Sequence, residues 1–352
     1  MPVQCHDTMR LAIFRRRSRM LLAASALVMF AFVLAAVAQT QGGMTKARTA
    51  RQPPPYWAYA VNPPPDASTG AAKPAGVTRQ HAPNSKATFT LAQIGDLYGV
   101  PDWHPAGHPA MPEVVARGRK PDVYACGYCH LPNGQGRPEN SSLAGLSVDY
   151  MVQQMADFKS GQRKSSVPAD LPVAIMVAKE TQANEKEIQA AAAYFSGLKP
   201  KPWIRVVETS TVPKTHVAGW MLVVSEPVTM EPIGHRIIET PENLERTELR
   251  DDTSGFIAYV PVGSVKRGKA LVTTGGAGKT MACASCHGPD LKGVGNVPSI
   301  AGRSPSYIVR QLWDIQSGVR NGAATQLMKQ PVAKLTLDDM IAIAAYASSL
   351  HP

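Results

Sequence analysis

One six-residue pattern occurs twice in the chain: Ala125–His130 reads ACGYCH, and Ala282–His287 reads ACASCH. The cysteines and the histidine stand at matching places, and the two stretches lie 157 residues apart. Four of the five cysteines of the chain belong to these two stretches. Because chance seldom places scarce residues twice at the same spacing, the pattern indicates that one unit of structure and chemistry is repeated.

The arrangement C-x-x-C-H is the attachment signature of a c-type haem. The two thiols form thioethers with the haem vinyl groups, and the adjacent imidazole binds one face of the iron. The sequence therefore predicts two covalently bound haem c groups, with iron in each. The predicted attachment residues are Cys126, Cys129 and His130 in the first copy and Cys283, Cys286 and His287 in the second.

Two other interpretations use the same cysteines. Two C-x-x-C pairs fit a zinc site, and paired cysteines outside the cytoplasm fit redox-active disulfides. The wide separation of the pairs disfavours zinc. The histidine that follows each pair has no role in a disulfide, so both interpretations rank below haem.

The other face of each iron needs a second ligand, and the internal repeat offers a candidate. Ser147–Arg163 aligns with Ser304–Arg320 at an offset of 157, and Ala191–Leu198 aligns with Ile343–Leu350 at 152. In the later register Met176 falls on Met328, and both are predicted as distal iron ligands. Three further methionines, Met151, Met155 and Met340, align with apolar residues and are predicted to lie in helix cores.

These motifs, in this order, resemble the class I cytochrome c domains found in tandem in dihaem cytochromes of the c-four family. The resemblance covers residues 117–198 and 265–352. It implies a mainly α fold with two helical haem domains and His/Met ligation. It also implies that the carbonyl of Pro298 accepts a hydrogen bond from His287. At the corresponding place of the first copy stands Ser141, where the resemblance breaks.

Helix signals agree with a helical fold. Asn184 precedes two early glutamates as a possible N-cap, and Gly197 lies near the end of that helix. A second helix is predicted to start near Thr336 and to run through the apolar stretch that ends at Leu350.

The N-terminus resembles an export signal. Five arginines precede an uncharged run, Met20–Ala38, that ends in a small-x-small cleavage pattern. The run is also nearly long enough to cross a bilayer, so both a cleaved signal peptide and a retained inner-membrane anchor stay open. Either outcome places the remainder outside the cytoplasm, in the periplasm. The formal net charge is +11, and loss of the five arginines and Asp7 leaves +7.

The predicted organisation has five parts. They are a signal peptide or anchor (1–38), a Pro-rich tether and loop (39–112), a first cytochrome domain (113–200), an insert of short strands (201–262) and a second cytochrome domain (263–352). His104 and His108 lie in a proline-bound loop predicted to rest on the first domain, with metal binding disfavoured. The stretch Gly275–Thr280 is predicted to be a turn and not a nucleotide loop.

Three classes of function fit a dihaem chain. The first is an electron carrier, with no catalytic residues, that passes single electrons between redox proteins of a respiratory chain. Its donor is a dehydrogenase or quinol-oxidising complex, and its acceptor is a terminal oxidase or reductase. The second is a peroxidase or thiosulfate-type dehydrogenase with an open or exchangeable iron ligand, for which His216 and His235 are alternative ligands. The third is a haem sensor, for which no output domain is visible. Nucleic acid is not an expected partner.

Overall fold

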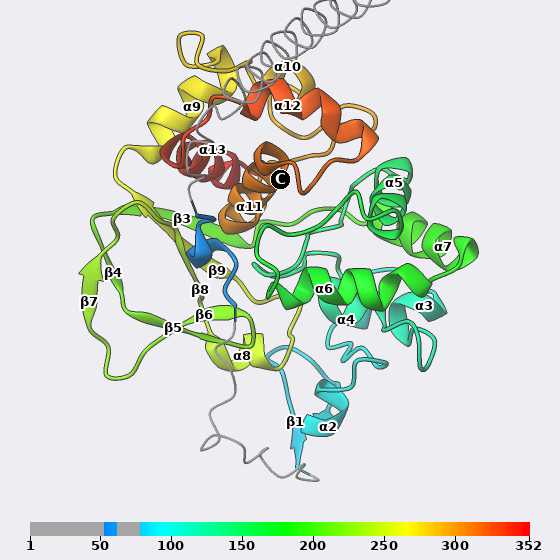
Figure 1. Cartoon of the computed structure of the whole chain (residues 1–352). Helices are drawn as coiled ribbons and strands as arrows, with labels where there is room; N and C mark the ends of the chain where they lie inside the picture. The colour runs from blue at the N-terminus through cyan, green and yellow to red at the C-terminus, as the bar shows by residue number, and fades with distance from the viewer. Residues whose placement is uncertain (1–52, 62–77) are drawn as a thin grey trace, which may run out of the picture. The chain divides into compact units, whose positions relative to one another are not determined.

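Helices in a repeated order make up most of the two halves that carry the cysteine pairs. A computed structural model describes residues 53–61 and 78–352 of the chain (Figure 1). The first half contains α3 (Glu113–Ala116), α4 (Cys126–His130), α5 (Val148–Lys159), α6 (Leu171–Ala178) and α7 (Glu185–Ser196). The second contains α9 (Ser264–Thr274), α10 (Ala284–His287), α11 (Pro305–Ser317), α12 (Gln326–Val332) and α13 (Leu337–Ser349). The predicted mainly helical fold is confirmed.

The helix ends follow local sequence signals. Asn184 is the N-cap of α7. Its side chain accepts a hydrogen bond from the backbone N–H of Glu187, and the Glu187 carboxylate accepts one from the backbone N–H of Asn184. Thr336 and Asp339 form the same capping box at the start of α13. Both predicted helix starts are therefore confirmed, as is the end of α7 at Gly197.

Each half has its own apolar core. In the first half, Met151, Ile188 and Phe195 are among the buried residues that join α5 to α7. In the second half, Met340 is fully buried with its neighbours on α13. The prediction that Met151 and Met340 are core residues is confirmed, and Met155 is partly buried against the first core.

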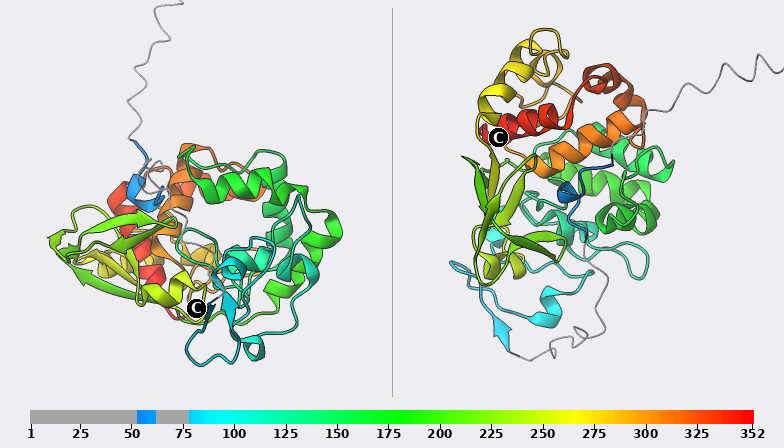
Figure 2. Two further views of the ribbon diagram at one scale, coloured as in Figure 1. Left: turned by 90° about the horizontal axis from the view of Figure 1, so that it is seen from below. Right: turned by 60° about the vertical axis from the view of Figure 1, so that its left-hand side comes forward.

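The segment between the halves consists of short strands and one short helix. Its elements are β3 (Ile204–Thr209), β4 (Thr211–Pro213), β5 (Thr215–Ala218), β6 (Met221–Val224), β7 (Met230–Pro232), β8 (Ile238–Pro241), α8 (Leu244–Glu248) and β9 (Phe256–Pro261). The largest sheet has the order β3-β9-β8, with β3 parallel and β8 antiparallel to β9. Strand β3 also contacts helix α13 (Figure 2).

This insert is joined to both halves by hydrogen bonds. Gln135 of the first half donates to the Ser254 carbonyl at 2.8 Å. Buried Glu239 of β8 accepts from the hydroxyls of Ser304 at 2.8 Å and Ser306 at 2.6 Å, at the start of α11. The insert therefore connects the halves through tertiary contacts as well as through the chain.

Part of the stretch predicted as a tether packs onto the second half. A single 3-10 turn, Tyr56–Ala58, places Ala58 and Tyr59 in the second core. The Tyr59 hydroxyl donates to Asp314 Oδ1 of α11 at 2.8 Å. Burial, with the Asp314 charge, raises the pKa of Tyr59, so the phenol stays protonated as a donor. Residues 53–61 are thus a docked segment.

A small cluster lies farther along the N-terminal region. It includes β1 (Arg79–Gln80), β2 (Phe89–Thr90), α2 (Leu91–Ile94) and the 3-10 turn Pro105–Gly107. Trp103 is buried there and donates from Nε1 to the Leu249 carbonyl of the insert at 2.7 Å. The proline-bound loop therefore contacts the insert as well as the first half.

No helix among residues 53–61 and 78–352 is long and apolar enough to cross a membrane. The predicted signal peptide or anchor, residues 1–38, lies outside the described residues.

A close helix crossing depends on Gly268. A Cβ at this position of α9 would lie 1.9 Å from the Ala342 carbonyl oxygen of α13, well inside van der Waals contact. Gly268→Ala should therefore lower the free energy of unfolding by about 1–3 kcal/mol, measured by urea titration of the holoprotein. Gly197→Ala is the matched control, because its Cβ would meet nothing closer than 3.6 Å. Equal stability of the two variants would show that the crossing tolerates a methyl group.

Candidate haem sites

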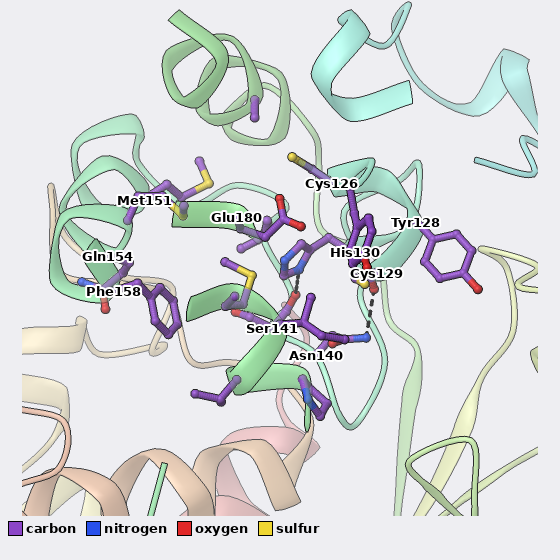
Figure 3. Close-up of a pocket in the computed structure, with 18 of the residues that line it drawn as sticks. Cys126, Tyr128, Cys129, His130, Asn140, Ser141, Met151, Gln154, Phe158 and Glu180 are labelled. Carbon is purple, nitrogen blue, oxygen red and sulfur yellow. Dashed lines mark hydrogen bonds between the residues drawn. The ribbon is translucent and has the colours of Figure 1, made fainter. Parts of the chain in front are cut away.

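The first cysteine pair opens into a cavity of about 360 Å³ (Figure 3). Cys126, Cys129 and His130 from α4 line it together with Met176 from α6. Much of the remaining wall is apolar and includes Leu97, Val114, Met151, Met155, Phe158, Ile175, Ile188 and Phe195. The cavity thus gathers two thiols, an imidazole and a thioether inside an apolar wall, which suits a covalently held macrocycle with two axial ligands.

Each motif histidine is oriented by a backbone carbonyl eleven residues later. His130 Nδ1 lies 2.8 Å from the Ser141 oxygen, and His287 Nδ1 lies 2.8 Å from the Pro298 oxygen. A carbonyl can only accept, so Nδ1 carries the proton and Nε2 keeps its lone pair for a metal. Burial lowers the pKa of His130 to about 4, which keeps the ring neutral. Sequence reasoning missed Ser141 because the backbone, and not the side chain, makes this contact.

The second site repeats this arrangement with a more open surface. His287 is buried, while Cys283 and Met328 are half-buried against the same core cluster. Cys286 is exposed. Of the predicted residues, Cys283 and Met328 therefore pack against one core in the second half.

The four described cysteines are free. Burial raises the pKa of Cys129 and of Cys283 to about 11, so both thiols are protonated at neutral pH. Within residues 53–61 and 78–352, the only group of metal-binding side chains close enough to hold an ion contains no cysteine. The interpretation of the two pairs as one zinc site is therefore wrong, because the pairs do not come together.

A buried polar network joins the two halves. Its members are related by the same 157-residue offset: Tyr150 and Tyr307, Gln154 and Gln311, Arg163 and Arg320. Arg163 donates to Gln154 Oε1 and to the Tyr307 hydroxyl, both at 3.0 Å. Arg320 donates to Gln311 Oε1 at 2.8 Å and to the Tyr150 hydroxyl at 3.1 Å. Each arginine therefore contacts both copies.

The arginine end of this network reaches the first cavity. Arg163, Arg310 and Tyr307 line it, at positions far in sequence from the cysteines. Arg320 Nε is buried with no hydrogen-bond partner. Although burial raises the pKa of Tyr307, the charges of Arg163 and Arg320 lower it overall. The guanidinium groups of Arg163 and Arg310 suit an anionic ligand edge, and the two propionates of haem supply one. Four carboxylates line the same cavity: Glu139, Glu180, Glu187 and Asp314.

The insert covers the first motif and leaves the second open. Residues 131–139 are mostly buried, whereas the matching residues 288–296 are mostly exposed. Arg250 of the insert stacks 3.6 Å above the Tyr128 ring and donates to the Tyr128 carbonyl at 2.9 Å. In the second copy Val294 is 61% exposed, and on α12 Leu327, beside Met328, is 80% exposed. The two sites therefore differ in their access to other proteins.

The two sites also differ in one buried carboxylate, which only the first site has. Glu180 lines the first cavity, is 8% exposed and is labelled in Figure 3. Burial raises its pKa to about 7, against a hydrogen bond from the Tyr124 backbone that lowers it. The residue at the matching offset of 152 is Val332, which is buried and apolar. The alignment of the two copies already pairs Glu180 with Val332, but only the structure shows that Glu180 lines the cavity.

The two alternative ligands predicted from the insert, His216 and His235, lie away from the first cavity. His216 bonds to Ser225 on the exposed side of β5, and His235 pairs with Asp338 on the surface. Neither lines the first cavity. The stretch Gly275–Thr280 is a turn, as predicted.

Several known proteins are similar to this chain in sequence. The family model "Cytochrome c" matches residues 265–351. A thiosulfate dehydrogenase electron acceptor of Stutzerimonas stutzeri (strain A1501) is 38% identical over 236 residues, which cover 66% of this chain and 82% of that protein. Cytochrome c4 of Azotobacter vinelandii is 25% identical over 274 residues, 76% of this chain and 100% of that one.

A solved structure of cytochrome c4 from Acidithiobacillus ferrooxidans is 23% identical, with a TM-score of 0.42, and covers 64% of this chain and 98% of that one. On the sequence matches and the haem-attachment signatures, the chain belongs to the c-type cytochromes, in the tandem class I group that includes cytochrome c4. Members of this family transfer electrons through covalently bound haem c.

Proposed function

We propose that the chain is a dihaem electron carrier outside the cytoplasm, with one iron bound by His130 and Met176 and the other by His287 and Met328. The observation that carries this proposal is that His130 and Met176, far apart in sequence, line one cavity with both cysteines of the first motif. The internal repeat, with an offset of 157 for the histidines and 152 for the methionines, extends the assignment to the second copy. The boundaries 113–200 and 263–352 for the two domains remain part of the proposal.

The cysteines, histidines and methionines of each site have separate roles in this proposal. Bound haem supplies a one-electron iron couple. The cysteines fix the macrocycle to the chain, and the Ser141 and Pro298 carbonyls hold the two imidazoles with Nε2 free for iron. Met176 and Met328 would be the second iron ligands, and a soft thioether there would favour the reduced iron and leave no position for a substrate.

The enzyme alternative finds less support. A peroxidase or thiosulfate-type dehydrogenase requires an open or exchangeable iron ligand. His216 and His235 do not line the first cavity, and the four described cysteines all belong to the attachment motifs. The relatives named as electron acceptors of thiosulfate dehydrogenase favour a carrier that serves such an enzyme.

The partner docks at the second site. Val294, in the loop after the second motif, and Leu327, beside Met328, are exposed apolar side chains, while the insert covers the first motif. Three exposed lysines in this part of the chain, Lys292, Lys329 and Lys334, outnumber the exposed acidic residue Asp290. Basic charge around an apolar centre suits an acidic redox protein, and the formal charge of +7 outside residues 1–38 agrees with this. A thiosulfate dehydrogenase is the proposed donor.

The location outside the cytoplasm rests on the arginine-rich N-terminus and the apolar run Met20–Ala38. Haem-bearing cysteine pairs without disulfide partners fit an exported cytochrome.

Removal of the distal methionines tests the ligand assignment. Met176→Ala and Met328→Ala should each open one iron to carbon monoxide in the reduced protein and lower that site's potential, because a soft axial ligand is lost. Absorption spectra with and without carbon monoxide measure this.

The matched controls are Met155→Ala, which also lines the first cavity, and Met281→Ala, near the second motif. Both controls should stay closed to carbon monoxide. Spectra of Met176→Ala or Met328→Ala that match the unmodified protein would remove that methionine from the ligand set.

Glu180 should make the first potential depend on pH. Its pKa is about 7, so between pH 6 and pH 8 it loses a proton and places a negative charge in the cavity. That charge stabilises the oxidised iron, so the potential should fall as pH rises, on the order of tens of mV and below the limit of about 59 mV per pH unit.

Redox titration of Glu180→Gln should give a flat first potential over this range. The second potential, with Val332 at the matching place, is the internal control. A pH slope that survives in Glu180→Gln would assign the proton to another group.

A charge placed at the second site should weaken partner docking. Leu327→Asp puts a carboxylate where an acidic partner would approach, and should slow reduction by a thiosulfate dehydrogenase about tenfold, equivalent to ~1.4 kcal/mol. Val228→Asp, on an exposed side chain of the insert, is the control and should leave the rate unchanged. Stopped-flow reduction at low and high salt measures both. Equal rates for the two variants would place docking elsewhere.

A further inference from the structure

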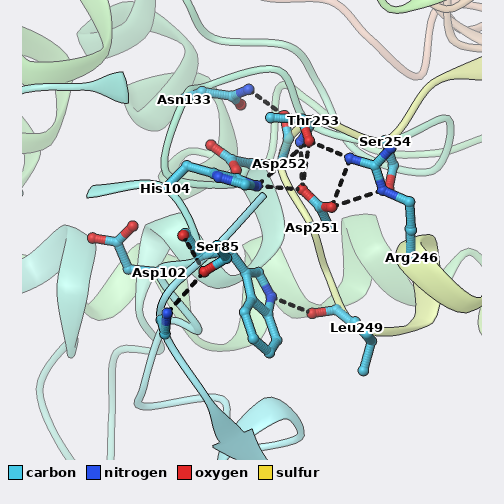
Figure 4. A network of polar contacts seen from close by, with 12 residues as sticks. Ser85, Asp102, His104, Asn133, Arg246, Leu249, Asp251, Asp252, Thr253 and Ser254 are labelled. Carbon is cyan, nitrogen blue, oxygen red and sulfur yellow. Dashed lines mark hydrogen bonds and ion pairs between the residues drawn. The ribbon is translucent and has the colours of Figure 1, made fainter. Parts of the chain in front are cut away.

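A cluster of ionisable side chains lies at the junction of the N-terminal loop and the insert (Figure 4). His104 Nε2 is 3.0 Å from Asp251 Oδ1, although 147 positions separate the two residues. His104, Asp251 and Asp252 each offer one ligand atom, and these three atoms all lie within 4.8 Å of one another. His104, Asp251 and Asp252 therefore direct three ligand atoms into one small volume.

Asp252 is the unusual member of this cluster. Its side chain belongs to a residue that is 3% exposed, and its Oδ1 atom has no hydrogen-bond partner. Its backbone carbonyl accepts a hydrogen bond from Asn133. A buried carboxylate oxygen without a hydrogen-bond donor is costly unless a cation lies beside it.

The neighbouring cationic side chains already pair with other carboxylate oxygens. Arg246 donates to Asp251 Oδ2 at 2.8 Å, and His108 Nε2 faces Asp102 Oδ1 at 3.2 Å. Two carboxylates against one guanidinium leave this site with a net negative charge when His104 is neutral. The His104 side chain is 17% exposed, which gives an ion a route from solvent.

We infer that His104, Asp251 and Asp252 bind one divalent transition-metal ion of the zinc type, separate from the haem irons. One imidazole and two carboxylates form a donor set that such ions accept, with water completing the shell. Ligands about 2.0–2.1 Å from a common ion lie roughly 3 Å apart, close to the observed separation of His104 Nε2 and Asp251 Oδ1.

The ion would fasten the cover of the first haem motif. Asp252 accepts from Asn133 through its carbonyl, and Arg250 holds Tyr128, inside the first attachment motif. A metal bridge from His104 to the insert would fix these contacts in the folded state, and its binding free energy would add to stability. The sequence disfavoured metal binding by His104 and His108, whereas the structure places His104 beside two aspartates of the insert, Asp251 and Asp252.

Zinc binding to the full-length dihaem protein tests the inference. After treatment with EDTA and buffer exchange, titration with Zn²⁺ should saturate at one equivalent per chain by calorimetry and by elemental analysis. The melting temperature should rise with bound Zn²⁺. His104→Ala and Asp252→Asn should each weaken zinc binding at least about 100-fold and abolish the thermal shift.

His235→Ala is the matched control, because it removes a different surface His–Asp pair, and it should bind zinc as the unmodified protein does. Asp252→Asn keeps the shape of the side chain and removes an unpartnered buried charge, so it should fold at least as stably without metal; its haem spectrum checks this. The inference is overturned if the unmodified protein takes up no stoichiometric zinc, or if His104→Ala and Asp252→Asn bind it as tightly as His235→Ala.

Discussion

The hydrogen bond from each motif histidine to a backbone carbonyl is the constraint on which each site depends. It fixes the direction of the ring, keeps Nδ1 protonated and leaves Nε2 toward the cavity. The C-x-x-C-H motif places the histidine at the end of a short helix, but a histidine there could turn toward solvent. The loop that returns eleven residues later prevents this, and the packing of α5 against α7 and of α11 against α13 holds that loop in place.

Local chemistry made some of this structure predictable from the sequence. Asn184 and Thr336 begin helices because their side chains accept backbone hydrogen bonds, which depends on a few adjacent residues. The repeat offset placed Met176 and Met328 in register for the same reason that it aligned the helices. These features need no knowledge of distant parts of the chain.

Other features depend on distant parts of the chain and were not visible in the sequence. Ser141 replaces a proline without loss of the contact, because the accepting atom is a carbonyl that every residue has. Tyr59 lies in a proline-rich stretch that reads as a spacer, yet its hydroxyl is bonded to Asp314 some 255 positions away. His104 and Asp251 meet only because the insert folds back onto the N-terminal loop. No periodic pattern in the sequence predicts such contacts.

The two copies share a sequence pattern but differ in solvent exposure, so the two sites are not equally accessible to other proteins. The insert buries the loop after the first motif, while the equivalent loop of the second copy is exposed.

Arg163 and Arg320 hold the copies in a fixed relation, because each donates to side chains of both. Separation of the halves would break these cross-copy hydrogen bonds, each of which contributes about 1.5–3 kcal/mol net because its donor is charged. A covered first site fixed to an exposed second site is the arrangement expected of a carrier whose partners approach from one side.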